Sequence, residues 1–256
     1  MVVAGTDHQT PASRTLATAI LSPRVRRALE NQLQTALSDF DRKLSVVLME
    51  TDLHLGRQRE QSSLPKLQVA AFESARMLRA AEAGLITYFL RELEAGLADI
   101  GGPRGARRLE DVAVRSRELA LVDDSETNEG GALTNIALRN DSRNSLALQL
   151  MGYRYGVLAG APAFDAEDLP LGPHALCHAL RTAASEAGLS ADVRLLIYRQ
   201  FEKFAMADYP ALLDMLNARL AEDGILPHLS FVPVRVRTFI DLAVRTWAED
   251  VRAAVE

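Results

Sequence analysis

The chain contains one cysteine, three lysines and no long apolar run, and these shortages exclude several classes of protein and of site. Cys177 is the only cysteine, so an internal disulfide and a cysteine-rich zinc site are both excluded. Chemistry that depends on lysine has only Lys43, Lys66 and Lys203 to draw on. The longest apolar runs, such as residues 85–90, are far shorter than the roughly 20 residues that a transmembrane helix needs. We therefore expect no membrane span.

The overall composition is typical of a globular protein. Hydrophobic residues make up 48% of the 256 residues and charged residues 25%, which provides enough apolar material for a large core. The net charge of −5 gives no general attraction to nucleic acid, so no nucleic-acid partner is expected. Arginine outnumbers lysine by 26 to 3, which favours a GC-rich and therefore bacterial source. Residues 1–13 do not have the pattern of a signal peptide, and this predicts a cytoplasmic location.

Apolar residues recur every three or four positions through residues 22–100, a spacing that predicts two long helices. Ser22, followed directly by proline, predicts the start of the first helix, and Gly56 predicts its end. Ser63 is expected to cap the second helix, which should run to Ile100, just before a Gly-Gly-Pro break. The prediction for this part of the chain is a long antiparallel helical hairpin.

The rest of the chain is expected to form three further parts. Residues 1–21 are predicted to be a disordered lead-in. Residues 101–118 are rich in arginine and are predicted to be a basic linker. Residues 119–256 are predicted to form a helical bundle subdomain, with an acidic loop at residues 123–131 that ends in two glycines. The predicted fold class is therefore all-α.

Capping residues and glycines divide the second half of the chain into short helices. The expected helix starts are Pro173, Ser190, Asp208 and Thr238, and the expected ends are Gly160, Gly188 and Gly224. Within residues 190–227, seven apolar residues are predicted to form one buried cluster between two neighbouring helices. They are Val193, Leu196, Ile197, Phe201, Leu213, Leu216 and Leu220. Asn217 lies on the same face and is predicted to be a core amide with hydrogen-bond partners.

Five short strings within residues 119–227 carry a family resemblance. They are Leu119-Ala-Leu-Val-Asp123, Leu171-Gly172-Pro173 with Leu176-Cys177, Leu195-Leu-Ile-Tyr198 with Phe201, the string from Leu213 to Leu220, and Gly224-Ile-Leu-Pro227. In order and spacing they resemble a large family of uncharacterised, mostly proteobacterial proteins, which is classed as a domain of unknown function. Some of its members carry the label thymidine phosphorylase.

The resemblance implies a helical protein for which no activity, cofactor or catalytic residue is established. It also implies a shortened chain, because typical members are longer at the C-terminus. At residues 130–131 the family pattern favours an uninterrupted helix, whereas two glycines in succession favour a loop, since each costs a helix about 1 kcal/mol.

His174, Cys177 and His178 fall on one predicted helix. The histidines are four residues apart, so both imidazoles can face one side and a metal ion could bridge them. Cys177 is turned by about 100° from His178 and would be a third ligand only with strain. The simpler interpretation is a buried cysteine between two surface histidines. No metal site is assigned, and a metal-dependent enzyme using His174 and His178 is one alternative function.

An arginine cluster follows the predicted hairpin and suggests an anion or partner contact. Its members are Arg104, Arg107, Arg108, Arg115 and Arg117. The spacing R-x-x-x-R at Arg104 and Arg108, with a later Asp123-x-Ser125, is similar to the cyclic-dinucleotide motif of PilZ domains, in which guanidinium groups bind phosphate. Asn128 stands where that motif has glycine, and the roughly six strands of a PilZ barrel are not evident. A receptor for an anionic small ligand such as a cyclic dinucleotide is the other alternative function.

The common motifs of enzyme active sites are missing. The sequence contains no P-loop, no dinucleotide-binding glycine motif after a strand and no G-x-S-x-G elbow. It also contains no glycine-rich phosphate cradle of the kind that a nucleoside phosphorylase would need. We therefore predict no catalytic residues and no cofactor. The expected function is that of a non-enzymatic, cytoplasmic binding or regulatory protein that acts through protein–protein contacts.

The predicted hairpin has more apolar residues than one seam between two helices can hide. The surplus consists of Leu48, Met49, Leu53, Leu55, Met77, Ile86 and Leu90. Some of these should meet the rest of the chain. The remainder should form a homodimer or a partner surface, since large exposed apolar patches usually mark interfaces. The neighbouring arginine cluster would favour an acidic partner.

Overall fold

The computed structural model describes residues 15–102 and 124–229, without side-chain detail at residues 124–128. Within these residues it contains six α-helices and no β-strand, so the predicted all-α class is confirmed. The helices are α1 (Pro23–Gln61), α2 (Pro65–Ala98), α4 (Asp124–Ala159), α5 (Pro173–Glu186), α6 (Ala191–Gln200) and α7 (Tyr209–Glu222). A short 3₁₀ turn, η1 (Ala166–Asp168), precedes α5, and a π-helical turn, η2 (Phe201–Ala205), continues α6. The helix predicted to start at Thr238 lies outside the described residues.

The first helix begins where the sequence predicts and runs further than expected. The Ser22 hydroxyl accepts a hydrogen bond from the backbone N–H of Val25, and a proline opens the first turn. Gly56 does not end the helix, which continues to Gln61 and reaches about 58 Å at 1.5 Å per residue. The next helix is capped by Leu64 and not by Ser63, and Leu64 supplies no side-chain hydrogen bond.

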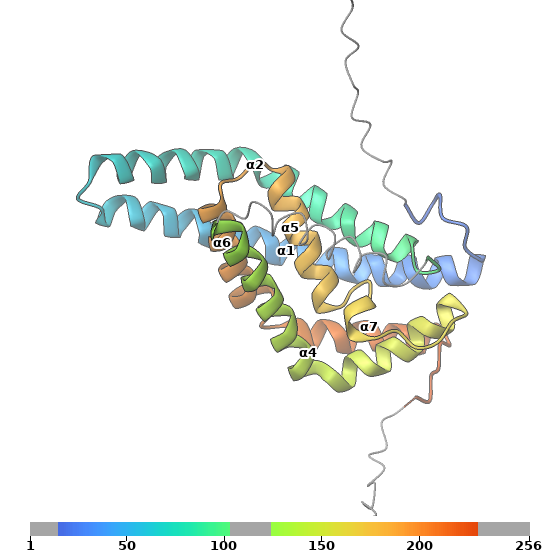
Figure 1. Cartoon of the computed structure of the whole chain (residues 1–256). Helices are drawn as coiled ribbons and strands as arrows, with labels where there is room; N and C mark the ends of the chain where they lie inside the picture. The colour runs from blue at the N-terminus through green and yellow to red at the C-terminus, as the bar shows by residue number, and fades with distance from the viewer. Residues whose placement is uncertain (1–14, 103–123, 230–256) are drawn as a thin grey trace, which may run out of the picture.

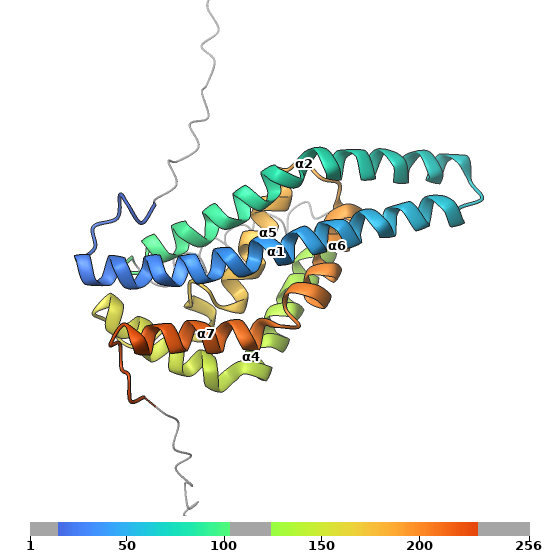
Figure 2. The same ribbon diagram turned by 180° about the vertical axis from the view of Figure 1, so that it is seen from behind.

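The long helices α1 and α2 lie side by side in opposite directions and form one layer of the molecule (Figure 1). On the body of the molecule, α6, η2 and α7 pack along α1, and α5 packs against α2. The bent helix α4 covers α5, α6 and α7 from the other side (Figure 2). The outer ends of α1 and α2 extend past all of these elements in both views. We call this protruding part, residues 49–82, the arm.

The aromatic centre of the core joins the two layers. Phe40 of α1, Phe89 of α2 and Phe201 of η2 are at most 1% exposed. Their ring centroids are 5.3 to 6.4 Å apart, within the range of favourable aromatic pairs. One continuous buried cluster therefore contains residues from α1, α2 and the later helices.

The segment predicted to be an acidic loop at residues 123–131 is helical from Asp124 onwards, so this prediction is wrong. Glu129 supplies a tertiary reason. Its buried carboxylate accepts two hydrogen bonds from the guanidinium of Arg194 on α6, at 2.9 and 2.8 Å. Leu133 and Ile136 are also buried one and two turns further on. These contacts offset the helix cost of two glycines, about 1 kcal/mol each.

The seven apolar residues predicted to form a core within residues 190–227 are all buried. They do not lie between α6 and α7, however. These helices follow one another along α1, and each packs on α1 and α4 and not mainly on the other (Figure 2). The π-helical turn and the residues after it carry the chain forward along α1 instead of folding it back. The predicted direct packing of the two helices is therefore wrong.

Residues 15–21 are folded, although the sequence predicts a disordered lead-in up to residue 21. Leu16 and Ala19 are buried in the main core cluster. The backbone N–H of Leu16 donates a hydrogen bond to the carboxylate of Glu94 on α2, at 3.1 Å. The Ala19 carbonyl accepts one from Arg26, at 2.9 Å. These contacts fix the segment against the start of α1 and the end of α2.

Candidate functional site

The clearest polar pair at a helix–helix junction is formed by His174 and Asp141. His174 occupies the first turn of α5, and its Nε2 lies 2.6 Å from an Asp141 carboxylate oxygen on α4. The side chains are 26% and 19% exposed, respectively. The other carboxylate oxygen of Asp141 is buried without a hydrogen-bond partner among the described residues. The pair therefore links α4 to α5 and holds the imidazole in one orientation.

Cys177 lies close to this pair but is not poised as a nucleophile or metal ligand. The side chain is buried, and burial, together with the negative charges of Asp141 and Glu202, raises the pKa of its thiol to about 12. The thiol is therefore neutral near pH 7, whereas both nucleophilic attack and metal binding require the thiolate. Within residues 15–102 and 124–229, no three His, Cys, Asp or Glu side chains are placed to hold a metal ion. The Nε2 atom of His174 is paired with the Asp141 carboxylate.

The Asp141 carboxylate was not among the residues that sequence reasoning selected. It lies on a helix that the structure places against α5, 33 residues away along the chain. No local spacing signal links residues so far apart, and only the packing of α4 on α5 brings them together.

A second buried polar network surrounds Arg154 on α4. Its guanidinium donates to the side-chain oxygen of Asn217 and to the backbone carbonyls of Ile225 and Leu226. The Asn217 amide also donates to the carbonyl of Ala147, at 3.0 Å. Burial lowers the pKa of Arg154. Asn217 is therefore a core amide with partners, as predicted, and the network holds the end of α7 on α4.

The five predicted contact arginines, Arg104, Arg107, Arg108, Arg115 and Arg117, lie outside the described residues. The cyclic-dinucleotide receptor therefore stays a prediction from the sequence.

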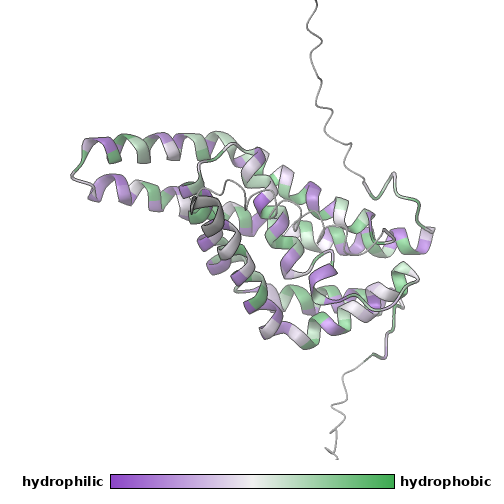
Figure 3. Cartoon of the chain, viewed as in Figure 1, coloured by the Kyte–Doolittle hydropathy of each residue, from purple (hydrophilic) through white to green (hydrophobic). Residues whose placement is uncertain are grey.

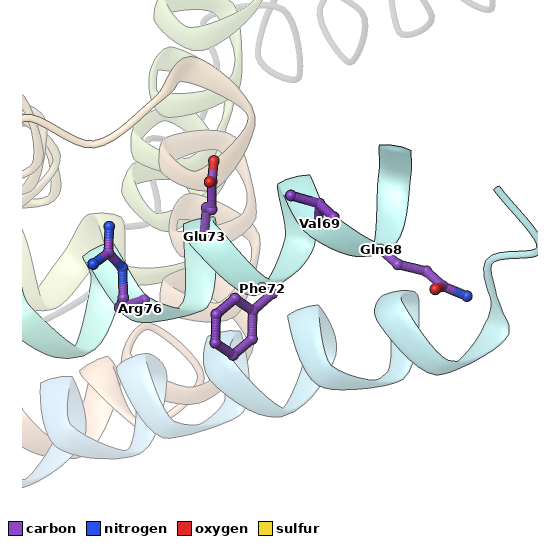
Figure 4. A pocket seen from close by; sticks show the side chains of 5 residues that line it. All are labelled: Gln68, Val69, Phe72, Glu73 and Arg76. Carbon is purple, nitrogen blue, oxygen red and sulfur yellow. The ribbon is translucent and has the colours of Figure 1, made fainter. Parts of the chain in front are cut away.

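The arm carries the largest group of exposed apolar side chains in the described part of the chain. Seven side chains from both of its helices are between 45% and 59% exposed. They are Met49, Leu53, Leu64, Leu67, Val69, Phe72 and Met77. Figure 3 shows hydrophobic residues along the arm as well as in the body of the molecule. Two of them, Val69 and Phe72, line an open hollow together with Gln68, Glu73 and Arg76 (Figure 4).

The sequence identified part of this surface. Of the surplus apolar residues predicted for the hairpin, Met49, Leu53 and Met77 are exposed. The others are covered: Leu48 and Leu55 are buried, and Ile86 and Leu90 pack against the core. The sequence did not identify the exposed residues at the start of α2. Some of them, such as Leu67, continue the helical spacing of residues that are buried further along α2, such as Ala71 and Leu78. Only the protrusion of the arm leaves them uncovered.

The fold and this surface define an all-helical protein with a projecting two-helix arm. The comparison with known families then gives a particular assignment. The family model described as "Protein of unknown function (DUF1631) N-terminal domain" matches residues 24–224, and the chain belongs to this family. The match includes α1 and α2 as well as the later helices α4 to α7. No curated protein and no solved structure gives a significant match.

None of the described helices combines the length and apolar character that a membrane crossing requires.

Proposed function

We propose that this protein acts by binding other protein chains, without catalysis, and that the arm is its contact surface. The supporting observation is the group of seven large apolar side chains, each about half exposed, on a segment that projects from the body. Large apolar side chains that gather on one exposed segment usually mark an interaction site in a folded protein. The expected cytoplasmic location and regulatory role belong to the same proposal.

The thin interior of the arm gives a physical reason for this role. Its two helices pack on each other mainly through small or isolated side chains, with Ala71, Ala75 and Leu78 of α2 buried toward α1. An isolated pair of helices gains little stability from such a narrow seam, since most helical stability comes from tertiary packing. A partner laid across the exposed side chains would remove apolar surface from water and stabilise both helices.

The experiment is capture of binding partners by the full chain and by two double variants. Leu53→Asp with Phe72→Asp changes the arm, and Leu146→Asp with Val157→Asp is the matched control on α4, where both residues are also exposed. The arm variant should lose the captured proteins, a second copy of the chain included, and the control should retain them. Circular dichroism of both variants checks that the fold is intact. Equal capture by the wild type and the arm variant would refute the proposed function.

A further inference from the structure

We propose that the arm's partner is a second copy of this chain, with the two arms packed antiparallel to form a four-helix bundle. The inference rests on the proposed function, because it names the occupant of the same surface. Two-helix units that retain apolar faces commonly complete a bundle by two-fold pairing, in which the same surface serves both copies.

The distribution of charge along the arm selects this partner and this direction. The tip half of the arm, residues 56–70, has a net charge of +2. Its charged residues are Arg57, Arg59, Glu60 and Lys66. The base half, residues 49–55 and 71–82, has a net charge of −2. Its charged residues are Glu50, Asp52, Glu73, Arg76, Arg79 and Glu82.

This arrangement is self-complementary in one orientation only. In an antiparallel pair, the positive tip of each copy faces the negative base of the other, so both ends attract. In a parallel pair, tip would meet tip and base would meet base, and like charges across an interface disfavour association. The arm as a whole has a net charge of zero, although the full chain has a net charge of −5. Two arms that approach each other therefore do not repel through their net charge.

The apolar residues lie on stripes that suit such packing. Met49 and Leu53 are one turn apart on α1, and Val69 and Phe72 are one turn apart on α2. The ion pair of Arg79 with Asp52, at 2.9 Å, joins the two helices across the same side. Phe72 lies two turns before Arg79 and so on this side of α2, and Figure 4 shows its ring directed from α2 toward α1.

The exposed area is sufficient for a stable contact. The four side chains of these stripes are about half exposed and leave on the order of 100 Å² each, or roughly 400 Å² of apolar area per arm. A standard protein–protein interface removes about 800 Å² from each partner. An arm-to-arm contact that includes the polar residues between these side chains falls in this range.

Sedimentation equilibrium of the full chain tests the association. We expect twice the chain mass of 28.0 kDa at tens of micromolar protein, and 28.0 kDa for the variant Val69→Asp with Phe72→Asp. Arg59→Glu with Lys66→Glu changes the net charge of the tip half from +2 to −2 and should weaken the dimer, because a negative tip then meets a negative base. Adding Glu50→Lys and Glu73→Lys changes the base half from −2 to +2, so the two halves exchange their charges and the dimer should be restored. Leu146→Asp on α4 is the control and should leave the mass unchanged.

Engineered cysteines test the direction of packing, because the native Cys177 is buried and does not compete. Ser63 at the tip and Ala80 near the base are both exposed. A mixture of Ser63→Cys and Ala80→Cys chains should form a mixed disulfide dimer, and Ser63→Cys alone should not link to itself. A tip-to-tip disulfide would overturn the antiparallel arrangement.

The result separates this inference from the proposed function. A wild-type chain that stays monomeric at these concentrations, or a dimer that survives the arm variants, overturns the second-copy proposal. In either case the capture experiment still decides whether the arm binds a different protein, since its readout includes partners other than this chain. Loss of the dimer in the arm variants, with rescue by charge exchange, supports pairing through the arm.

Discussion

Replacing Phe201 by alanine should destabilise the whole molecule, because this ring joins the α1–α2 layer to the later helices. Phe201 is fully buried and lies 6.4 Å from the Phe40 ring and 6.2 Å from the Phe89 ring, measured between centroids. The substitution Phe201→Ala removes the side chain from both contacts and leaves a cavity between α1, α2 and η2.

The expected cost follows from this geometry. Truncation of a fully buried phenylalanine typically costs about 3–5 kcal/mol, the sum of lost transfer free energy and a cavity term. Each aromatic pair contributes about 0.5–1.5 kcal/mol beyond area burial, so Phe201→Ala in combination with Phe40→Ala should show a coupling free energy of that size. For a chain of this length, about 2–4 °C of melting temperature per kcal/mol predicts a decrease of about 6–20 °C.

Urea and thermal denaturation followed by circular dichroism provide the measurement. The control is Met215→Ala on α7, where the side chain is 48% exposed, and this change should cost less than about 1 kcal/mol. The wild type should unfold in one transition, because the buried cluster is continuous. A loss below about 1 kcal/mol for Phe201→Ala, or two separate transitions in the wild type, would show that the aromatic centre does not couple the two layers.

Three further predictions follow from individual positions. Ile197→Ala, at a fully buried site, should cost about 2–5 kcal/mol in denaturant melts, and the exposed Arg199→Ala less than about 0.5; equal losses would mean that the faces of α6 are misassigned. Gly131→Ala should stabilise the protein by about 0.5–1 kcal/mol, because this helical glycine has open space around it, and a loss of stability in melts would contradict the helix at residues 130–131. Gly152→Ala should destabilise the protein, because the new Cβ would lie 2.3 Å from the Phe164 carbonyl oxygen. Cys177 should resist a thiol reagent at pH 8 in the folded protein and react in urea, since a pKa of about 12 leaves about one thiolate in ten thousand; rapid labelling of the folded protein would show that the thiol is accessible.

The local chemistry of the sequence was enough to predict the helical class and many helix ends. Gly160, Gly188 and Gly224 all take positive φ angles just after a helix, the conformation for which glycine is favoured. Pro173 opens α5 as predicted, because its missing N–H is not needed in a first turn. Such signals depend on a few neighbouring residues, and the sequence contains them in full.

The predictions that failed concern positions where tertiary contacts outweigh a local preference. A glycine at position 56 is only a weak helix breaker, and the buried Leu55 beside it keeps α1 packed against α2. The glycines at 130–131 are helical beside Glu129, whose pairing with Arg194 joins segments 65 residues apart. No pattern in either segment alone contains that information.

The sequence by itself therefore determined that the chain forms amphipathic helices, where most of them begin and end, and which family the later strings resemble. The tertiary structure alone decided which helices meet, because apolar faces are interchangeable in sequence and become specific only through packing. It placed Asp141 against His174, gave α6 and α7 the same neighbours α1 and α4, and covered Leu48 and Leu55 while leaving Leu67 and Phe72 exposed. Helical spacing defines a face of a helix, but exposure depends on whether another element lies over it, and at the arm none of the described elements does.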